Sequence, residues 1–141
     1  VISVDEFWET PVDVFIPAAL EGMLNEKRAH QLRARVVAEA ANAPTTPEAD
    51  AVLASRGIEV IPDMLCNAGG VTVSYFEWVQ NRSNVIWDVE QVDRELNRIM
   101  CAATRRVIMA KQKYSTTLRT AAYISVLEHI GDIYNHRGIW P

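Results

Sequence analysis

Polar side chains that could bind a ligand gather between residues 67 and 81. This segment combines two adjacent glycines with amides, a hydroxyl and large aromatics, in the order Asn-Ala-Gly-Gly-Val-Thr-Val-Ser-Tyr-Phe-Glu-Trp-Val-Gln-Asn. Asn67, Val71 and Ser74 are spaced four and three residues apart, so in a helix they would share one face. The glycines would let a ligand approach the backbone closely. The segment is therefore predicted to be a binding face.

The same residues have a purely structural interpretation. Asn67 could cap a helix, the glycines could form a turn, and the Ser74 hydroxyl could bond back to a carbonyl one turn earlier. The β-branched and aromatic run from Val71 to Phe76 favours a strand by intrinsic propensity, whereas the spacing favours a helix. The residues alone leave these alternatives open.

A second candidate site follows an apolar run at residues 35–41. Asn42 comes directly after this run, which is predicted to be a buried strand, and ligands of open α/β sheets bind beyond the carboxyl ends of strands. Ala18 and Ala19 end an earlier strand on the same rim, where small side chains leave room for a flat ring. Alternatively, Asn42 stabilises a turn and the alanines only pack tightly.

The elements that must position these residues alternate in the first half of the chain. Apolar runs predict parallel strands at 12–19, covered on both faces, at 35–41, and within 58–65. Between them, Asn25 is placed to cap a short helix reaching about Leu32. Thr46 and Pro47 are typical of another helix start, and Gly57 of its end. The pattern predicts an α/β fold with a parallel sheet.

The second half predicts two long amphipathic helices. Apolar residues recur every three or four positions from Val89 to about Tyr114, after Asp88 as a cap. A second stripe follows 115–117 and closes at Gly138. We expect residues 1–80 to form one unit with the parallel sheet and residues 81–141 to be a helical segment that packs on it.

Composition excludes several classes of function. Of the 141 residues, 49% are hydrophobic and 23% are charged, as in a soluble globular protein, and no apolar stretch is long enough to span a bilayer. The net charge of −4 gives no reason to bind nucleic acid. Cys66 and Cys101 lack metal-ligand spacing and are interpreted as reduced thiols of a cytoplasmic protein. No metal site is predicted.

Five motifs together resemble the glutamate dehydrogenase family over nearly the entire chain. The segment 67–81 carries the resemblance most strongly, and it favours the helix over the strand. The other motifs are 13–21 (Asp-Val-Phe-Ile-Pro-Ala-Ala-Leu-Glu), 41–50 (Ala-Asn-Ala-Pro-Thr-Thr-Pro-Glu-Ala-Asp), 119–124 (Arg-Thr-Ala-Ala-Tyr-Ile) and 137–141 (Arg-Gly-Ile-Trp-Pro). The resemblance implies the later half of a Rossmann-like sheet followed by two long C-terminal helices, with residues 1–80 as the C-terminal part of a dinucleotide-binding domain.

The resemblance also implies a reaction, cofactors and partners. Such enzymes oxidise L-glutamate to 2-oxoglutarate and ammonia with NAD or NADP, and they assemble as homo-oligomers, typically hexamers. By position, Asn42 would contact the nicotinamide-side ribose and Asn67 the nicotinamide carboxamide, with Ala18 and Ala19 also on the cofactor side. Val71 and Ser74 would line the pocket for the distal carboxylate of the substrate, with Ser74 as the donor.

The chain departs from the family pattern in two ways. Ala40 and Ala43 stand where many members have glycine. The catalytic lysine and aspartate and the glycine-rich dinucleotide loop lie upstream in the family and are not found in this chain. No catalytic residue is therefore assigned here, and we expect this segment to be inactive without the remainder of its own subunit.

Two other functions remain open. The chain could be a truncated, non-catalytic subunit that associates with intact dehydrogenase subunits and modulates them. It could instead belong to a branched-chain amino-acid dehydrogenase, a class that diverges from this sequence after Val71. Ser74 favours glutamate, because a hydroxyl placed for a charged group would be left unpaired by an apolar substrate.

Overall fold

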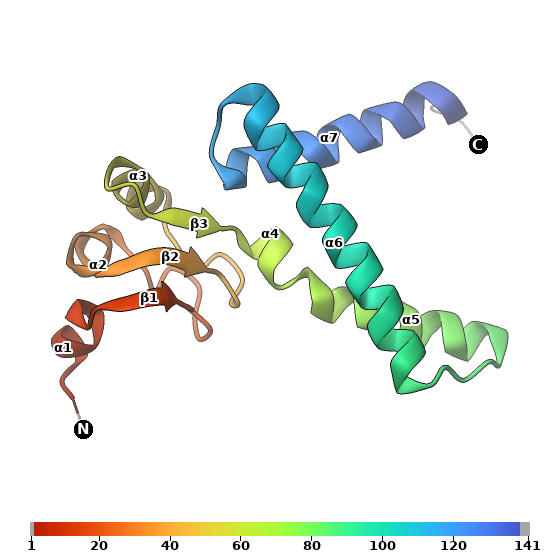
Figure 1. The fold of residues 1–141 in the computed structure, drawn as a ribbon, viewed down its shortest axis with the longest axis horizontal. Coiled ribbons are helices and arrows are strands. Elements are labelled where there is room, and N and C mark those ends of the chain that lie inside the picture. Colours follow the sequence, from red (N-terminus) through yellow and green to blue (C-terminus); the bar gives the residue numbers. More distant parts are fainter. Residues whose placement is uncertain (1, 139–141) are drawn as a thin grey trace.

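A parallel three-stranded sheet forms the first half of the molecule, in the order β1-β2-β3 (Figure 1). The computed structural model describes residues 2–138. Both strand pairings are parallel, with Val12 opposite Ala34 and Val36 opposite Glu59. The strands are β1 (Val12–Phe15), β2 (Ala34–Ala38) and β3 (Glu59–Ile61). The predicted α/β class and parallel pairing are confirmed.

Short helices flank and separate the strands, and longer helices come after them. Those of the first half are α1 (Val4–Glu9), α2 (Glu26–Gln31), α3 (Pro47–Ser55) and α4 (Asp63–Cys66). Those of the second half are α5 (Ala68–Ser83), α6 (Val89–Tyr114) and α7 (Leu118–Arg137). The spacing of apolar residues does not predict α1, because this helix has only 6 residues. The capping box of Ser3 and Glu6 stabilises its start.

Predicted helix starts agree with the observed caps. The side chains of the predicted caps Asn25, Thr46 and Asp88 each accept a hydrogen bond from the backbone N–H three residues later. Thr117, which is not a predicted cap, makes the same bond at the start of α7. Gly57 follows α3 with a φ of 70°, a conformation that glycine adopts without strain. The segment 68–83 is helical, so the spacing and not the strand propensity of its residues decides its structure.

Two clusters of buried side chains stabilise the fold. One lies between the sheet and the helices α1, α2 and α3, and the other lies where α6 and α7 meet the end of the sheet. The first contains Trp8, Phe15, Leu24, Ala29, Leu32, Val37, Ala49, Leu53, Ile58 and Val60. The second contains Leu65, Val107, Ala110, Ala121 and Ala122. The proposed division near residue 80 remains a prediction.

The strand β1 is not covered on both faces, and that prediction is wrong for the residues described. Val12 and Val14 are 38% and 50% exposed, whereas Phe15 is buried. The reason is that the helices between the strands cover only the face on which Phe15 lies, and β1 is an edge of this sheet. Ile139, Trp140 and Pro141, which complete the last family motif, lie outside the described residues.

The long helix α6 links the other helices of the second half. It contacts both α5 and α7 and crosses them near its opposite ends (Figure 1). Phe76 of α5 is buried and its ring centroid lies 5.3 Å from that of Trp87, just before α6. Within residues 2–138, no helix combines the length and apolarity needed to cross a membrane.

Candidate functional site

A cleft of about 730 Å³ lies at the carboxyl ends of β1 and β2. Three segments form its walls: the residues after β1, the residues after β2, and the start of α5. The lining residues are Ala18, Ala19, Leu20, Glu21, Ala40, Ala41, Asn42, Asn67 and Val71. Parallel strands place their carboxyl ends on one edge, and this is why residues far apart in sequence meet here.

Asn42 and Asn67 are joined directly in this cleft. The Asn67 Nδ2 group donates to Asn42 Oδ1 at 2.8 Å and to the Ala40 carbonyl at 3.3 Å. Asn67 occupies the N-cap position of α5, but its side chain makes no capping bond. The bond leaves the Asn42 NH₂ group as a donor and the Asn67 carbonyl oxygen as an acceptor. The pair therefore presents complementary polar groups on one wall.

The loops after β1 and β2 are bound to each other beneath this wall. The backbone N–H groups of Ala40 and Ala41 both donate to the Pro17 carbonyl, at 3.1 and 2.9 Å. Pro17 is fully buried, whereas Ala18 and Ala19 are exposed to the cleft. The small methyl side chains leave the space beside the two amides open.

Val71 and Ser74 occupy successive turns of α5 but differ in position. Val71 lines the cleft and is 71% exposed. Ser74 is exposed and lies outside the residues that line the cleft, and its hydroxyl donates to the Gly70 carbonyl at 3.2 Å. The structure thus brings together Ala18, Ala19, Asn42, Asn67 and Val71, and it places Ser74 one turn further along the same helix.

The loop after β2 contains a strained residue beside the cleft. Ala43 has a φ of 44°, in the left-handed region that is unfavourable for any residue with a Cβ. Its N–H donates to Asp63 Oδ2 at 2.7 Å, and its carbonyl accepts from the Gly22 N–H at 2.9 Å. These bonds hold the backbone in place next to Asn42. The positive φ explains why glycine suits this position.

A buried ion cluster next to this loop is not predicted from the sequence. The Glu39 side chain is fully buried and pairs with Arg119, which also pairs with Asp50. Burial lowers the pKa of the Arg119 guanidinium, but its hydrogen bonds to Glu39 and Asp50 and the charges of both carboxylates raise that pKa by more. The guanidinium therefore stays charged. The only sequence signal is an acid placed directly after the apolar run Val36-Val37-Ala38.

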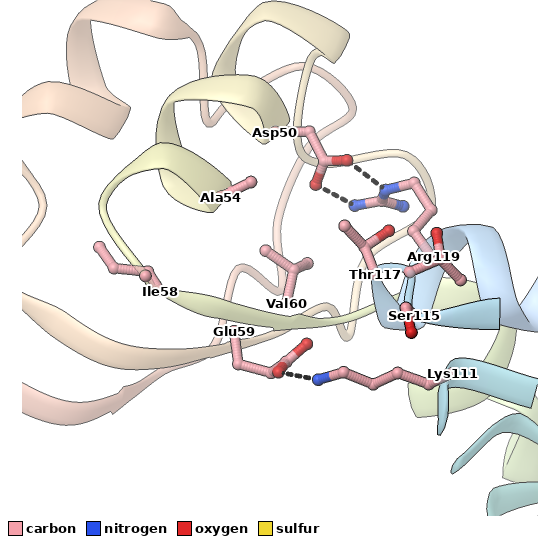
Figure 2. A pocket seen from close by; sticks show the side chains of 11 residues that line it. Asp50, Ala54, Ile58, Glu59, Val60, Lys111, Ser115, Thr117 and Arg119 are labelled. Atoms are coloured by element: carbon pink, nitrogen blue, oxygen red, sulfur yellow. Dashed lines mark hydrogen bonds and ion pairs between the residues drawn. The ribbon is translucent and has the colours of Figure 1, made fainter. Parts of the chain in front are cut away.

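A second cleft, of about 430 Å³, separates α3 and β3 from the loop between α6 and α7 (Figure 2). Two ion pairs border it, Glu59 with Lys111 and Asp50 with Arg119 (Figure 2). Each charged group already has an oppositely charged partner across the cleft. The arrangement ties the C-terminal helices to the sheet, and none of the predicted site residues lies there.

Cys66 lies one residue before Asn67 but is not a candidate nucleophile. Burial raises the pKa of its thiol, and the neighbouring charge of Glu39 raises it further. A nucleophilic cysteine requires the thiolate. The Cys66 side chain is therefore a neutral thiol near neutral pH.

Comparison with known proteins supports the resemblance identified from the motifs. Residues 1–138 match the model of the Glutamate/Leucine/Phenylalanine/Valine dehydrogenase family. The chain is 50% identical over 131 residues to an NADP-specific glutamate dehydrogenase A1 of Halobacterium salinarum, covering 92% of this chain and 31% of that protein. It is 47% identical over 137 residues to an NAD-specific glutamate dehydrogenase of Clostridioides difficile, covering 97% of this chain and 32% of that protein.

The structure is also similar to solved structures of this family. A hetero-hexameric glutamate dehydrogenase from Thermus thermophilus superposes with a TM-score of 0.91 and 32% identity, over 99% of this chain and 34% of that one. The chain thus spans about a third of the length of the relatives it matches.

Proposed function

The chain belongs to the Glutamate/Leucine/Phenylalanine/Valine dehydrogenase family, and on this premise we propose that it is the C-terminal portion of an NAD- or NADP-dependent glutamate dehydrogenase. The enzyme converts L-glutamate to 2-oxoglutarate and ammonia. The observation that carries the proposal is the hydrogen-bonded Asn42–Asn67 pair, which lies in an open cleft at the carboxyl edge of a parallel sheet.

The cleft fits the nicotinamide end of the coenzyme. The free donor of Asn42 and the free acceptor of Asn67 are complementary to a carboxamide or to ribose hydroxyls. Ala18 and Ala19 add small apolar walls that suit a flat ring, and the volume of about 730 Å³ is in the range of small-molecule sites. When bound, the nicotinamide accepts or donates the hydride. Asn42 and Asn67 would hold the nicotinamide end of the coenzyme through these two polar groups.

Val71 and Ser74 are assigned to the substrate. Val71 borders the coenzyme cleft, and Ser74 is exposed on the next turn of α5. A serine hydroxyl that bonds a carbonyl of its own helix at 3.2 Å can rotate to donate to a carboxylate instead. We assign this donation to the distal carboxylate of glutamate, and it distinguishes glutamate from leucine or valine.

The proton transfers of the reaction are assigned to residues outside this chain. The family resemblance places the catalytic lysine and aspartate upstream, and Cys66, the nearest thiol to the asparagine pair, stays protonated. We therefore propose that the segment contributes coenzyme and substrate contacts and does not turn over by itself.

The exposed apolar surface supports association with further protein. Val12, Val14 and Ile16 lie exposed in and just beyond β1, and Leu127 and Tyr134 lie exposed on α7. Apolar exposure on this scale marks interaction surfaces. We assign the β1 face to the remainder of the subunit and propose a homo-oligomer, as the resemblance implies.

The decisive experiment is turnover by the full-length polypeptide that contains this chain. L-Glutamate should be oxidised with NAD or NADP at a kcat/KM far above that for L-leucine or L-valine. Preference for leucine would assign the protein to the branched-chain class. The absence of any dehydrogenase activity, with retained binding to active subunits, would assign it to the modulating class.

A further inference from the structure

Arg119, in the first turn of α7, binds two carboxylates from the sheet half of the molecule. Its Nη2 and Nη1 atoms donate to Oε1 and Oε2 of Glu39 at 2.7 and 3.1 Å, and its Nε donates to Oδ2 of Asp50 at 3.1 Å. Glu39 follows β2 directly and is fully buried. Because an unpaired buried carboxylate is strongly unfavourable, Arg119 fixes the end of β2 relative to α7.

The contacts of Glu39 continue to Asp63 at the start of α4. Glu39 Oε2 also accepts from the Asp63 N–H at 2.8 Å, and Arg119 Nη1 lies 3.9 Å from Asp63 Oδ1. The other oxygen of Asp63 accepts from the Ala43 N–H at 2.7 Å. One guanidinium therefore orients, directly and through Glu39, the carboxylate that holds Ala43.

Ala43 is the point at which this chain of contacts reaches the cleft. Its left-handed backbone is unfavourable for alanine and is held by the Asp63 carboxylate on its N–H and by the Gly22 N–H on its carbonyl. Asn42 is covalently adjacent, and its Oδ1 accepts the bond from Asn67. Movement of the Asp63 carboxylate would free the Ala43 N–H, and the Asn42 amide would then shift from its position opposite Asn67.

We propose that Arg119 is a positioning residue for the Asn42–Asn67 pair. It does not line the coenzyme cleft, and it acts through Glu39 and Asp63. Arg119 thereby controls the coenzyme affinity that the proposed function assigns to the pair, and the inference rests on that function.

The geometry requires arginine and not any cation. The planar guanidinium donates to Glu39 through Nη1 and Nη2 and to Asp50 through Nε and Nη2, whereas the single ammonium group of lysine cannot reproduce this fork. Arg119→Lys should therefore restore the charge without the full geometry. Its coenzyme affinity is expected to lie between those of the wild type and Arg119→Met.

Lys111→Met provides a matched control. Lys111 pairs with Glu59 and, like Arg119, ties the C-terminal helices to the sheet half across the second cleft (Figure 2). Glu59 is at the start of β3, at the opposite end from the cleft that contains Asn42. Removal of this ion pair tests the effect of losing a contact between the C-terminal helices and the sheet without a change next to Asn42.

The test is made on the full-length polypeptide. The dissociation constants of NADH and NADPH are measured by fluorescence titration, together with the thermal unfolding midpoint. For the better-bound coenzyme, Arg119→Met should raise the dissociation constant by about 3- to 30-fold, in line with couplings transmitted through packed polar networks. Lys111→Met should lower the unfolding midpoint and leave the dissociation constant within about twofold, as expected for a distant independent site.

Equal coenzyme affinity in folded Arg119→Met and Lys111→Met would overturn the role of Arg119. If Arg119→Met does not fold, Arg119→Lys decides, and wild-type affinity in that variant overturns the proposal. Asn67→Ala distinguishes a failure of the Arg119 positioning role from a failure of the proposed function. Weakened coenzyme binding in Asn67→Ala with unchanged binding in Arg119→Met refutes only the positioning role, whereas unchanged binding in Asn67→Ala refutes the proposed function as well.

Discussion

The side-chain amide of Asn67 donates to the side-chain oxygen of Asn42 across 2.8 Å, and so joins the start of α5 to the loop that follows β2. Each amide is left with one unused type of group, a donor on Asn42 and an acceptor on Asn67. The pair is thereby fixed relative to both elements before a ligand arrives. Such preorganisation lowers the entropy cost of binding.

Replacement of Asn67 tests the coenzyme contact. Asn67→Ala removes the donor to Asn42 and Ala40 and the acceptor that we propose for the coenzyme. In the full-length protein we expect the dissociation constant for the reduced coenzyme to rise by about 3- to 10-fold, the value of one net hydrogen bond. Asn25→Ala is the control, because it removes the cap of α2 and Asn25 does not line the cleft. It should reduce stability by about 1 kcal/mol and leave coenzyme affinity unchanged.

Replacement of Ser74 tests the substrate contact. Ser74→Ala should raise the KM for glutamate by about 10- to 100-fold, because a hydrogen bond to a charged group is worth about 1.5–3 kcal/mol. Coenzyme affinity should not change, since Ser74 does not line the coenzyme cleft. Steady-state kinetics with glutamate and each coenzyme measure both quantities.

Ser83→Ala is the matched control for Ser74. The Ser83 hydroxyl makes the same kind of bond within α5, donating to the Val79 carbonyl at 2.7 Å, but it lies at the far end of the helix. Its KM for glutamate should equal that of the wild type. Similar kinetics in the two serine variants would remove Ser74 from the substrate site.

Replacement of Ala43 tests backbone strain beside the cleft. Alanine in the left-handed region costs about 1–2 kcal/mol, and glycine loses part of that advantage through the entropy of the unfolded chain. Ala43→Gly should therefore increase the free energy of unfolding by up to about 1 kcal/mol. Ala40→Gly serves as the control, because Ala40 is not among the positive-φ residues of the described chain. That change should decrease stability, and a stabilising effect at both positions would argue against strain at Ala43.

The Cys66 thiol predicts a pH dependence of stability. Burial, assisted by the charge of Glu39, raises its pKa above the ordinary value of 9.0, so the folded state holds this proton more tightly than the unfolded state. The contribution of Cys66 is therefore fully present below pH 9.0 and decreases as pH rises through the folded pKa. The difference in unfolding midpoint between the wild type and Cys66→Ala should be constant below that pH and should shift against the wild type above it. A difference independent of pH up to 10.5 would contradict the raised pKa.

Local sequence signals determined the elements and most of the candidate site. The caps Asn25, Thr46 and Asp88 depend only on residues within one helical turn, and the spacing of Asn67 and Val71 places them on one face of α5. The carboxyl-end rule for parallel strands then brings Asn42, Ala18 and Ala19 to the same edge. Periodicity, capping and this rule require no knowledge of distant contacts.

Only the tertiary structure decided how these residues are held. Glu39 and Arg119 are eighty residues apart in sequence, and no periodicity pairs a buried acid with a base on a remote helix. The same limit applies to the bond between Asp63 and Ala43, and to the exposure of Val12 and Val14, which depends on which face of the sheet the helices cover. Hydrophobic patterning specifies which face of an element is buried, but the partners of a buried charge depend on the three-dimensional packing of all the elements around it.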